Sequence, residues 1–373
     1  MNSTQDRWTV ERANRWWDQQ PWVCGFNFLP SSAVNFLDMW MDISFDPVTI
    51  RRELGWAKDI GFNSVRTNLH FLVWQNDRDE YLKRIDWFLE TAQELGLSVM
   101  PVLFDDCGFG GEEPVYGPQP SPLPQIHNGR AVASPGRAIV MNRPNWPALK
   151  LYVRDIIAQF ADDNRVLMWD LYNEPGNRMI FAGLGEHAEY DARLTEHSRD
   201  LMVACFEWAR EIGASQPLTV AAWRTPVAGS QEKAFDNEID ELALSLSDIV
   251  TFHAYCDRAH ALRYIDQLHE LGRPMLSTEW MARTIGSRIC DQLPLYHDRK
   301  VGCYNWGLVQ GRTQTNLPWP HTLESQHGEI VDEHAWFHDI LRADGTPYDP
   351  EETNLIMALS GVSNENGACA CRA

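Results

Sequence analysis

The sequence has no uninterrupted apolar segment of the ~20 residues that a membrane-spanning helix requires, so we expect no membrane association. It also lacks a basic segment followed by an apolar one near its start, because residues 1–20 are polar and contain tryptophan. We therefore expect a cytoplasmic location. Basic residues are few, since 32 lysines and arginines stand against 52 acidic residues and give a net charge of −20. This charge argues against nucleic acid as a partner.

Motifs for metals and nucleotides are absent as well. The eight cysteines form no C-x-x-C pair and none lies near histidine at zinc-site spacing, so we expect free thiols and no metal. Neither G-x-G-x-x-G nor G-x-x-x-x-G-K-[ST] follows the first expected strand, and we expect no cofactor. The chain does have 44% hydrophobic residues and sixteen tryptophans, which suit a large core and a pocket that stacks on flat rings.

Short apolar runs alternate with amphipathic segments along the chain. Eight strands are expected, at Trp22–Leu29, Ser64–Leu69, Ser98–Asp105, Val166–Asn173, Leu218–Trp223, Ile249–Tyr255, Met275–Trp280 and Gly302–Val309. Helical spacing between them predicts helices at Val48–Ile60, Glu80–Leu95, Ala148–Ala161, Ser198–Ile212 and Ala259–Leu271. Glycines stand where four of these helices should end, at Gly61, Gly96, Gly213 and Gly272. Asp46-Pro47 is typical of a helix start.

Strands that alternate with helices pair in parallel, either in a closed barrel or in a doubly wound open sheet. The count of eight, without a nucleotide motif, favours a single (β/α)₈ barrel of the α/β class. We expect this domain over residues 1–360, with a last helix near 354–359 and a flexible tail at 361–373.

The links that follow strands are the long ones, and they include Asp106–Pro147, Pro175–Glu196 and Gln310–Gly328. Long loops without regular structure in a compact domain are usually functional. In a (β/α)₈ barrel the active site is built from the loops that follow the strands. The sequence therefore predicts a site at the carboxyl ends of the strands.

Two glutamates close expected strands. Glu174 ends the fourth strand, and Glu279 ends the seventh. An unpaired carboxylate at the end of an apolar strand is costly to bury, so each must reach the barrel mouth or pair with a cation. Either acid alone is unremarkable in a chain with 52 of them, but the two together indicate a catalytic pair.

With these residues the sequence resembles the retaining glycoside hydrolases of clan A, in particular cellulase-like enzymes of family 5 or a close relative. In that clan the acid/base glutamate follows an asparagine at the end of strand four, here Asn173, and the nucleophile ends strand seven. Further positions match in order: Arg66 on strand two, His253 and Tyr255 on strand six and Trp306 on strand eight. The match extends over residues 21–341.

The resemblance implies that Glu279 is the nucleophile and Glu174 the general acid/base of a retaining mechanism, which needs carboxyls about 5–5.5 Å apart. Arg66 and Tyr255 would keep Glu279 ionised. Burial and the charge of Glu279 would raise the pKa of Glu174. Asn173 would bind the sugar 2-hydroxyl.

Seven residues are expected to bind substrate: Arg66, His70, Asp105, Asn173, His253, Tyr255 and Trp306. Trp306 would form the floor under the sugar, with a cis peptide bond to Gly307 as the resemblance suggests. Other polar residues of the loops, such as Asn35, His127 and Asn128, are interpreted as solvated or loop-bracing. One local difficulty is that strand alternation places Asn173 and Glu174 on opposite faces, so both reach the site only if the strand end bulges or turns.

The long loops suit a pocket, so we expect an exo-acting β-glycosidase with a small-molecule or oligosaccharide substrate. An endo-acting cellulase, mannanase or xylanase would use the same catalytic residues in an open cleft. A non-catalytic carbohydrate-binding barrel would be expected to lose one carboxylate. A metal-dependent amidohydrolase would need His-x-His at the end of strand one, which reads Gly25-Phe26-Asn27-Phe28 instead. The sugar, the linkage and the oligomeric state stay open.

Overall fold

The computed structural model describes residues 6–183, 186–230 and 232–362. Its main sheet contains eight parallel strands, β1 (Cys24–Asn27), β2 (Ser64–Asn68), β3 (Ser98–Asp105), β4 (Trp169–Asn173), β7 (Leu218–Thr219), β8 (Val250–His253), β9 (Met275–Trp280) and β10 (Gly302–Asn305). Neighbours follow the order β7-β4-β3-β2-β1-β10-β9-β8. The two edges meet through Ala222, whose N–H donates to the Thr251 carbonyl at 3.0 Å. The expected (β/α)₈ barrel is confirmed.

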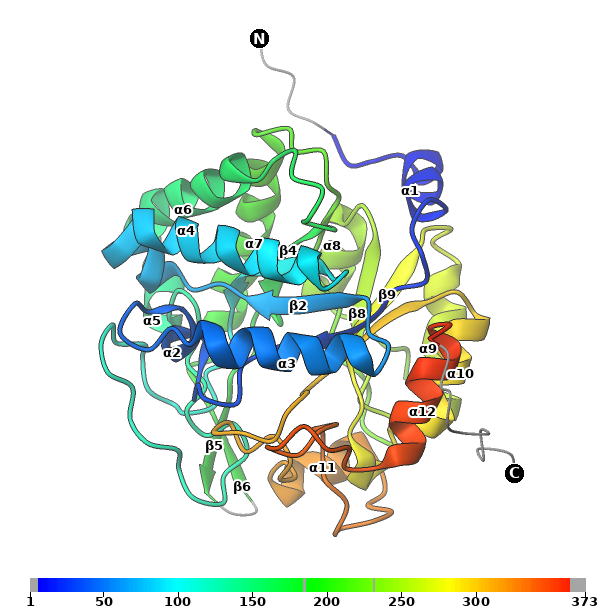
Figure 1. Ribbon diagram of the computed structural model, residues 1–373. Coiled ribbons are helices and arrows are strands. Elements are labelled where there is room, and N and C mark those ends of the chain that lie inside the picture. The colour runs from blue at the N-terminus through cyan, green and yellow to red at the C-terminus, as the bar shows by residue number, and fades with distance from the viewer. Residues whose placement is uncertain (1–5, 184–185, 231, 363–373) are drawn as a thin grey trace.

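A helix follows each strand on the outside of the barrel (Figure 1). These helices are α3 (Pro47–Asp59), α4 (Phe71–Glu94), α6 (Trp146–Gln159), α7 (Leu194–Arg210), α8 (Glu238–Leu246), α9 (Arg258–His269), α10 (Ile289–Asp298) and α12 (Pro350–Leu359). The expected helix ends are confirmed. Asp46 caps the start of α3 by accepting from the Thr49 N–H at 3.0 Å. The glycines expected at helix ends have left-handed φ values between 66° and 100°, at Gly61, Gly96, Gly213 and Gly272. No helix in the described ranges is long and apolar enough to cross a membrane.

The helix α12 corresponds to the expected last helix, and it begins four residues earlier than the sequence pattern indicated. Glu352 of α12 accepts two hydrogen bonds from the buried Arg283 guanidinium, at 2.9 and 2.6 Å. This bidentate pair fixes α12 against the segment that follows β9. The expected flexible tail falls mostly on residues 363–373, which lie outside the described residues.

The amino-terminal end of the barrel is covered by residues 6–9 and by α1 (Val10–Trp17), a helix that the sequence pattern did not predict. Trp8 packs against apolar side chains that point down the barrel, and its N–H donates to Asp248 at 2.8 Å. Inside, the ring of Tyr304 lies so close to Gly25 that a Cβ there would approach it to 2.4 Å. Side chains thus pack tightly inside this end of the barrel.

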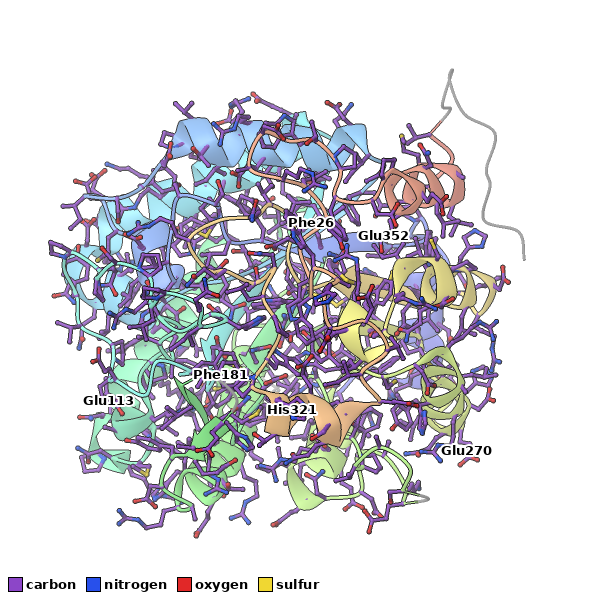
Figure 2. All side chains as sticks on the ribbon, turned by 90° about the horizontal axis from the view of Figure 1, so that it is seen from below. Phe26, Glu113, Phe181, Glu270, His321 and Glu352 are labelled. Atoms are coloured by element: carbon purple, nitrogen blue, oxygen red, sulfur yellow. The ribbon has the colours of Figure 1, made fainter. Side chains whose placement is uncertain are left out.

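The opposite end carries the long loops and their short elements. These are α2 (Phe36–Trp40), α5 (Arg137–Val140), η1 (Arg143–Asn145), η2 (Arg283–Ile285), α11 (His321–His327) and an antiparallel hairpin of β5 (Met179–Gly183) and β6 (Glu186–Glu189). The hairpin and α11 lie together at this end of the barrel, far from α1 (Figure 1). Seen from below, Phe181 of β5 and His321 of α11 lie near the centre of the face (Figure 2). The carboxyl ends of the strands therefore lie under a layer of loops.

Candidate active site

The carboxyl ends of the strands surround one cavity. It has a volume of about 870 Å³ with its mouth included. Seven of the nine expected site residues line it, namely Asp105, Asn173, Glu174, His253, Tyr255, Glu279 and Trp306. Two expected residues, Arg66 and His70, do not line this cavity.

Glu279 is held by a cation and a phenol. The Arg66 Nη1–H donates to Glu279 Oε1 at 3.0 Å, and the Tyr255 hydroxyl donates to Oε2 at 2.9 Å. The Glu279 residue is only 5% exposed, so both contacts act in a region shielded from water. Each of them favours the charged form of the carboxylate.

Arg66 is fully buried below the carboxylates. Its five donor contacts go to Glu279, to Asp170 at 3.0 and 2.8 Å, to Asn27 at 2.7 Å and to Asn173 at 2.6 Å. A guanidinium has five N–H groups, so every one has an acceptor. Arg66 therefore positions the groups above it and presents no surface to the cavity.

Glu174 has a left-handed backbone, with φ at 45°. This turn directly after β4 lets Glu174 and the preceding Asn173 both line the cavity, which answers the difficulty posed by strand alternation. Glu174 Oε1 lies 2.7 Å from His253 Nδ1, while Oε2 accepts from Asn177 Nδ2 at 2.6 Å and from the Cys107 thiol at 3.1 Å. A non-glycine residue in this conformation costs of order 1 kcal/mol or more, and such strain concentrates at functional sites.

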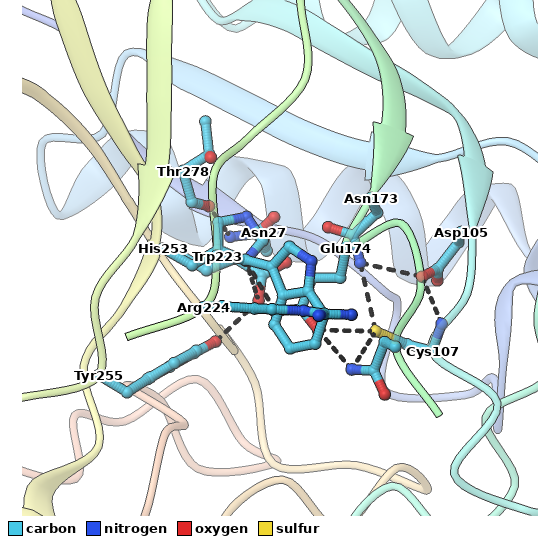
Figure 3. Close-up of polar contacts among 12 residues, drawn as sticks. Asn27, Asp105, Cys107, Asn173, Glu174, Trp223, Arg224, His253, Tyr255 and Thr278 are labelled. Atoms are coloured by element: carbon cyan, nitrogen blue, oxygen red, sulfur yellow. Dashed lines mark hydrogen bonds and ion pairs between the residues drawn. The ribbon is translucent and has the colours of Figure 1, made fainter. Parts of the chain in front are cut away.

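The two carboxyls have different partners, and Figure 3 shows the contact of Glu174 with Cys107. Burial raises the pKa of both Glu174 and Glu279. Glu279 has the Arg66 guanidinium and the Tyr255 hydroxyl, whereas Glu174 has no arginine or lysine within hydrogen-bonding distance among the described residues. Burial also lowers the pKa of His253 to about 4, so this imidazole is neutral near pH 7. The contacts of Glu279 with a cation and a phenol thus favour its charged form, whereas the partners of Glu174 carry no charge.

The same three side chains are close enough to share a cation. One oxygen of Glu174, one oxygen of Glu279 and a nitrogen of His253 all lie within 4.8 Å of one another. Arg66 already compensates the charge of Glu279, which makes this carboxylate a poor metal ligand. One oxygen of Glu174 and one of Glu279 therefore lie close enough for both carboxyls to act on the same bond of a bound molecule.

Of the expected residues Asp105 and His70, the first lines the cavity and the second lies at the start of α4. Asp105 lines the cavity and accepts from Asn68 Nδ2 and Asn173 Nδ2, each at 2.9 Å. Burial raises its pKa to about 6. His70 caps α4 instead, where its Nδ1 accepts from the Leu72 N–H at 3.2 Å. The structure therefore brings Asp105 to the site and leaves His70 outside it.

Trp306 lies on the cavity wall next to the end of β10. The expected cis bond between Trp306 and Gly307 is wrong, because within the described ranges the cis peptide bond is Ser134–Pro135. Gly307 has φ of 81°, and a Cβ there would approach the Asp339 carboxylate to 2.6 Å. A left-handed glycine in close contact with Asp339 therefore replaces the cis bond as the local turn.

Several residues of the site were not found from the sequence. They are Asn27, Cys107, Asp170, Asn177, Trp223 and Trp319. Cys107 and Asn177 lie two and four residues beyond the ends of β3 and β4, so proximity to a strand end was a usable signal. Trp319 lies deep in a long loop, and no local pattern marks it.

Aromatic rings build much of the upper wall. Phe109 and Phe181 stack with centroids 4.3 Å apart, and Trp319 meets Tyr255 edge-on at 4.9 Å. His127 lies beside Phe181, with centroids 6.0 Å apart. Burial lowers the pKa of His127 to about 4, so the ring is neutral near pH 7. The wall therefore offers rings and neutral polar groups to a ligand.

Hydrogen bonds join the loops around the mouth. The Phe181 N–H donates to the Phe109 carbonyl at 2.9 Å, which connects the hairpin to the loop after β3. The Asn128 N–H donates to the Thr313 carbonyl, and the Ala228 N–H donates to the Gln326 carbonyl, both at 2.7 Å. These bonds link the loops after β3 and β7 to the loop after β10. The rim is thus tied together across the barrel.

Comparisons with known proteins bear on this arrangement. No family model and no curated protein matches the sequence. Among solved structures, a variant of GH5_18 from Streptomyces cattleya in complex with Manβ1-4GlcNAc has 16% identity and a TM-score of 0.59, covering 93% of this chain and 82% of that one. The exo-β-1,4-mannosidase Op5Man5 from Opitutaceae bacterium strain TAV5 has 15% identity and a TM-score of 0.54, covering 91% and 59%. The chain has the barrel fold of glycoside hydrolase family 5.

An endo-acting enzyme shares this fold too. The GH5-4 broad specificity endoglucanase from Clostrdium longisporum has 13% identity and a TM-score of 0.54, covering 94% of this chain and 98% of that one. Structural similarity at these low sequence identities shows a common fold. The fold alone does not distinguish exo from endo action.

The Arg66→Met variant tests the buried network. Removing the guanidinium leaves Asp170 and Glu279 buried without their cation, which should lower the free energy of unfolding by about 3–5 kcal/mol near pH 7. Glu279 already has a raised pKa, and it would rise further above the unfolded value of about 4.3. A raised folded-state pKa gives stability that is present at low pH and lost as the pH rises. Urea unfolding should therefore show the deficit growing from about pH 4.5 to 7.5.

Arg51→Met is a matched control, because Arg51 pairs with Glu94 at the surface and both side chains are about half exposed. We expect this substitution to change stability by less than about 1 kcal/mol at every pH. A deficit in Arg66→Met that is constant over the same pH range would contradict the proposed electrostatic role of Arg66.

Proposed function

We propose that this chain is a retaining β-glycosidase that removes single sugars from the non-reducing end of short β-linked glycosides. The observation that carries the proposal is the unequal pair of carboxyls in one walled cavity. Glu279 has a guanidinium and a phenol as partners, and Glu174 has neutral ones. A retaining mechanism requires this division between an ionised nucleophile and a protonated acid.

In the first step Glu279 attacks the anomeric carbon while Glu174 gives its proton to the glycosidic oxygen. The bond between that carbon and oxygen breaks, the aglycone leaves as an alcohol, and a glycosyl ester forms on Glu279. Glu279 then carries no charge, so Glu174 can stay ionised beside it. In the second step Glu174 takes a proton from water, which attacks the anomeric carbon and releases Glu279 as a carboxylate.

Neighbouring groups supply position and charge. Arg66 holds Glu279 and Asn173 in one geometry through bonds of 3.0 and 2.6 Å. Asn173 lines the cavity beside Asp105, and in this proposal it binds the sugar 2-hydroxyl. Trp306 offers an aromatic face to the C–H groups of the ring.

The joined loops support exo action. An endo enzyme binds a chain that passes over the barrel, so it needs a groove open at both ends. Here the loop after β3 is bonded to the loop after β10 on one side, and the loop after β7 is bonded to α11 on the other. This closure leaves a pocket for a terminal sugar and a small aglycone.

Two solved structures suggest the glycone to test first. One contains Manβ1-4GlcNAc and another is an exo-β-1,4-mannosidase. We therefore propose β-mannosides as the leading substrates, with β-glucosides next. Endo-β-1,4-glycanase activity is the alternative, and the endoglucanase with the same fold favours it.

The nucleophile is tested by chemical rescue. Glu279→Ala should lower kcat on aryl β-glycosides by at least about 10⁴-fold, because the covalent step is lost. Azide should restore turnover and give the α-glycosyl azide, since it enters from the face that Glu279 leaves. Product anomers would be assigned by NMR. Glu53→Gln, a buried glutamate bonded to Ser31 outside the cavity, serves as the control and should stay active. A β-glycosyl azide from Glu279→Ala would refute the assignment.

The acid/base is tested by pH and leaving group. Burial raises the pKa of Glu174, and its protonated form is needed for aglycone departure. Activity should therefore fall as the pH rises through this raised pKa, which places the basic limb of the wild-type profile above the ordinary glutamate range. Glu174→Gln should abolish that limb. It should also slow alkyl glycosides far more than 2,4-dinitrophenyl glycosides, whose leaving group needs no proton. Equal losses on both substrates would contradict the role.

Exo action is tested by product analysis. β-1,4-Linked manno- and gluco-oligosaccharides of three to six units, labelled at the reducing end, would be digested and separated by chromatography. The pocket predicts release of unlabelled monosaccharide and shortening of the labelled product by one unit at a time. An early mixture of internal fragments would establish the endo alternative.

A further inference from the structure

The position of Glu174 gives the substrate a direction, if the proposed function holds. The acid protonates the leaving oxygen, so the aglycone lies on the side of β4. The far end of the glycone then faces the opposite wall of the barrel. In the strand order, β10 stands opposite β4 and β1 is its neighbour. That wall includes Leu29 and Phe36 after β1, and Asn128, whose N–H donates to the Thr313 carbonyl in the loop after β10.

Asn128 is held in this wall by its backbone. Its N–H donates to the Thr313 carbonyl at 2.7 Å, and its carbonyl accepts from the Ala131 N–H at 2.9 Å. Its φ is 46°, in the left-handed region, where asparagine is better tolerated than most residues. The bonds that brace this loop thus use backbone atoms and would be available to glycine as well. The hydrogen bonds that hold this loop therefore do not require the Asn128 side chain.

The Asn128 side chain lines the cavity and has no hydrogen-bond partner in the described part of the chain. The residue is only 7% exposed. Its Oδ1 and Nδ2 are nevertheless absent from the sealed polar atoms that lack a partner, so these groups are open to the cavity. The cavity is where these groups can find partners, and a carboxamide both donates and accepts, as a sugar hydroxyl does.

The other two asparagines of the cavity wall differ in this respect. Asn35 Nδ2 donates to Gln119 at 2.9 Å and to the Arg130 carbonyl at 3.0 Å. Asn173 is bonded to Arg66 and to Asp105. Asn128 is thus the asparagine of this wall whose side chain is not engaged within the described residues.

We propose that the Asn128 carboxamide binds a hydroxyl at the far end of the glycone, at C4 or C6, and so determines which terminal sugar the pocket accepts. This inference rests on the proposed function and extends it to the residue that selects the glycone. Asn128 takes no part in the bond-breaking steps, and its role in this proposal is to bind the sugar.

The test compares Asn128→Ala and Asn128→Gly on a parent aryl β-glycoside and on its 4-deoxy and 6-deoxy forms. The glycine variant accommodates the left-handed backbone, so it separates loss of the amide from strain. Both variants should lose about 10- to 100-fold in kcat/KM on the parent glycoside. On one deoxy glycoside they should match the wild type, because that substrate has already lost the hydroxyl. Asn35→Ala is the control and should show the same loss on every substrate.

A second readout does not depend on turnover. A six-membered iminosugar and its 4-deoxy and 6-deoxy analogues would be titrated while tryptophan fluorescence is followed. Weaker binding of the parent by the Asn128 variants, with unchanged binding of one analogue, supports the role even if the wild type hydrolyses no glycoside. That case would overturn the proposed function alone. Equal fold-changes across all ligands, or none, would overturn the role of Asn128, and wild-type protein that binds no iminosugar would overturn both.

Discussion

A buried guanidinium organises the carboxyl end of this barrel. Removing a charged group from water costs several kcal/mol unless its polar atoms are satisfied, and Arg66 meets this condition through all five of its N–H groups. Its acceptors come from β1, β4 and β9, so strands that are not all neighbours are fixed around one ion. The network that gives this end of the barrel its geometry also gives Glu279 its charge. Stability and chemistry therefore depend on the same contacts.

The difference between the two carboxyls follows from that arrangement. Desolvation raises the pKa of both, and two adjacent buried carboxylates cannot both ionise easily. The Arg66 contact favours the ionised form of Glu279. Glu174 can lie near Glu279 because the chain turns into a left-handed conformation directly after β4. A regular continuation of the strand would point this side chain toward the helices. The backbone turn at Glu174 thus brings the two carboxyls close together. The Arg66 guanidinium gives them different electrostatic surroundings, because it contacts Glu279.

Periodicity predicted most of the barrel because its signals are local. Apolar runs marked all eight strands, and glycine marked the helix ends through its left-handed φ. The resemblance located Glu174, Glu279 and the residues around them, since each is tied to a strand end. The sequence did not reveal the hairpin of β5 and β6, whose β6 residues are mostly exposed and carry no apolar alternation. Nor did it reveal that Asp170 completes the Arg66 network or that His70 caps α4. Those facts depend on side-chain directions and on contacts between distant segments.

The upper wall of the cavity complements the charged floor by adding little charge of its own. His127 Nδ1 lies 2.7 Å from the Leu317 carbonyl, and His338 Nδ1 lies 2.5 Å from the Met281 carbonyl. A carbonyl only accepts, so Nδ1 carries the hydrogen in both rings and Nε2 is an acceptor. Burial lowers the pKa of both, which keeps them neutral. No imidazolium therefore competes with Arg66 for Glu279. In the proposed mechanism a neutral sugar would bring no charge into this cavity, so the positive charge that develops at its anomeric carbon in the transition state would meet Glu279 where little water screens it.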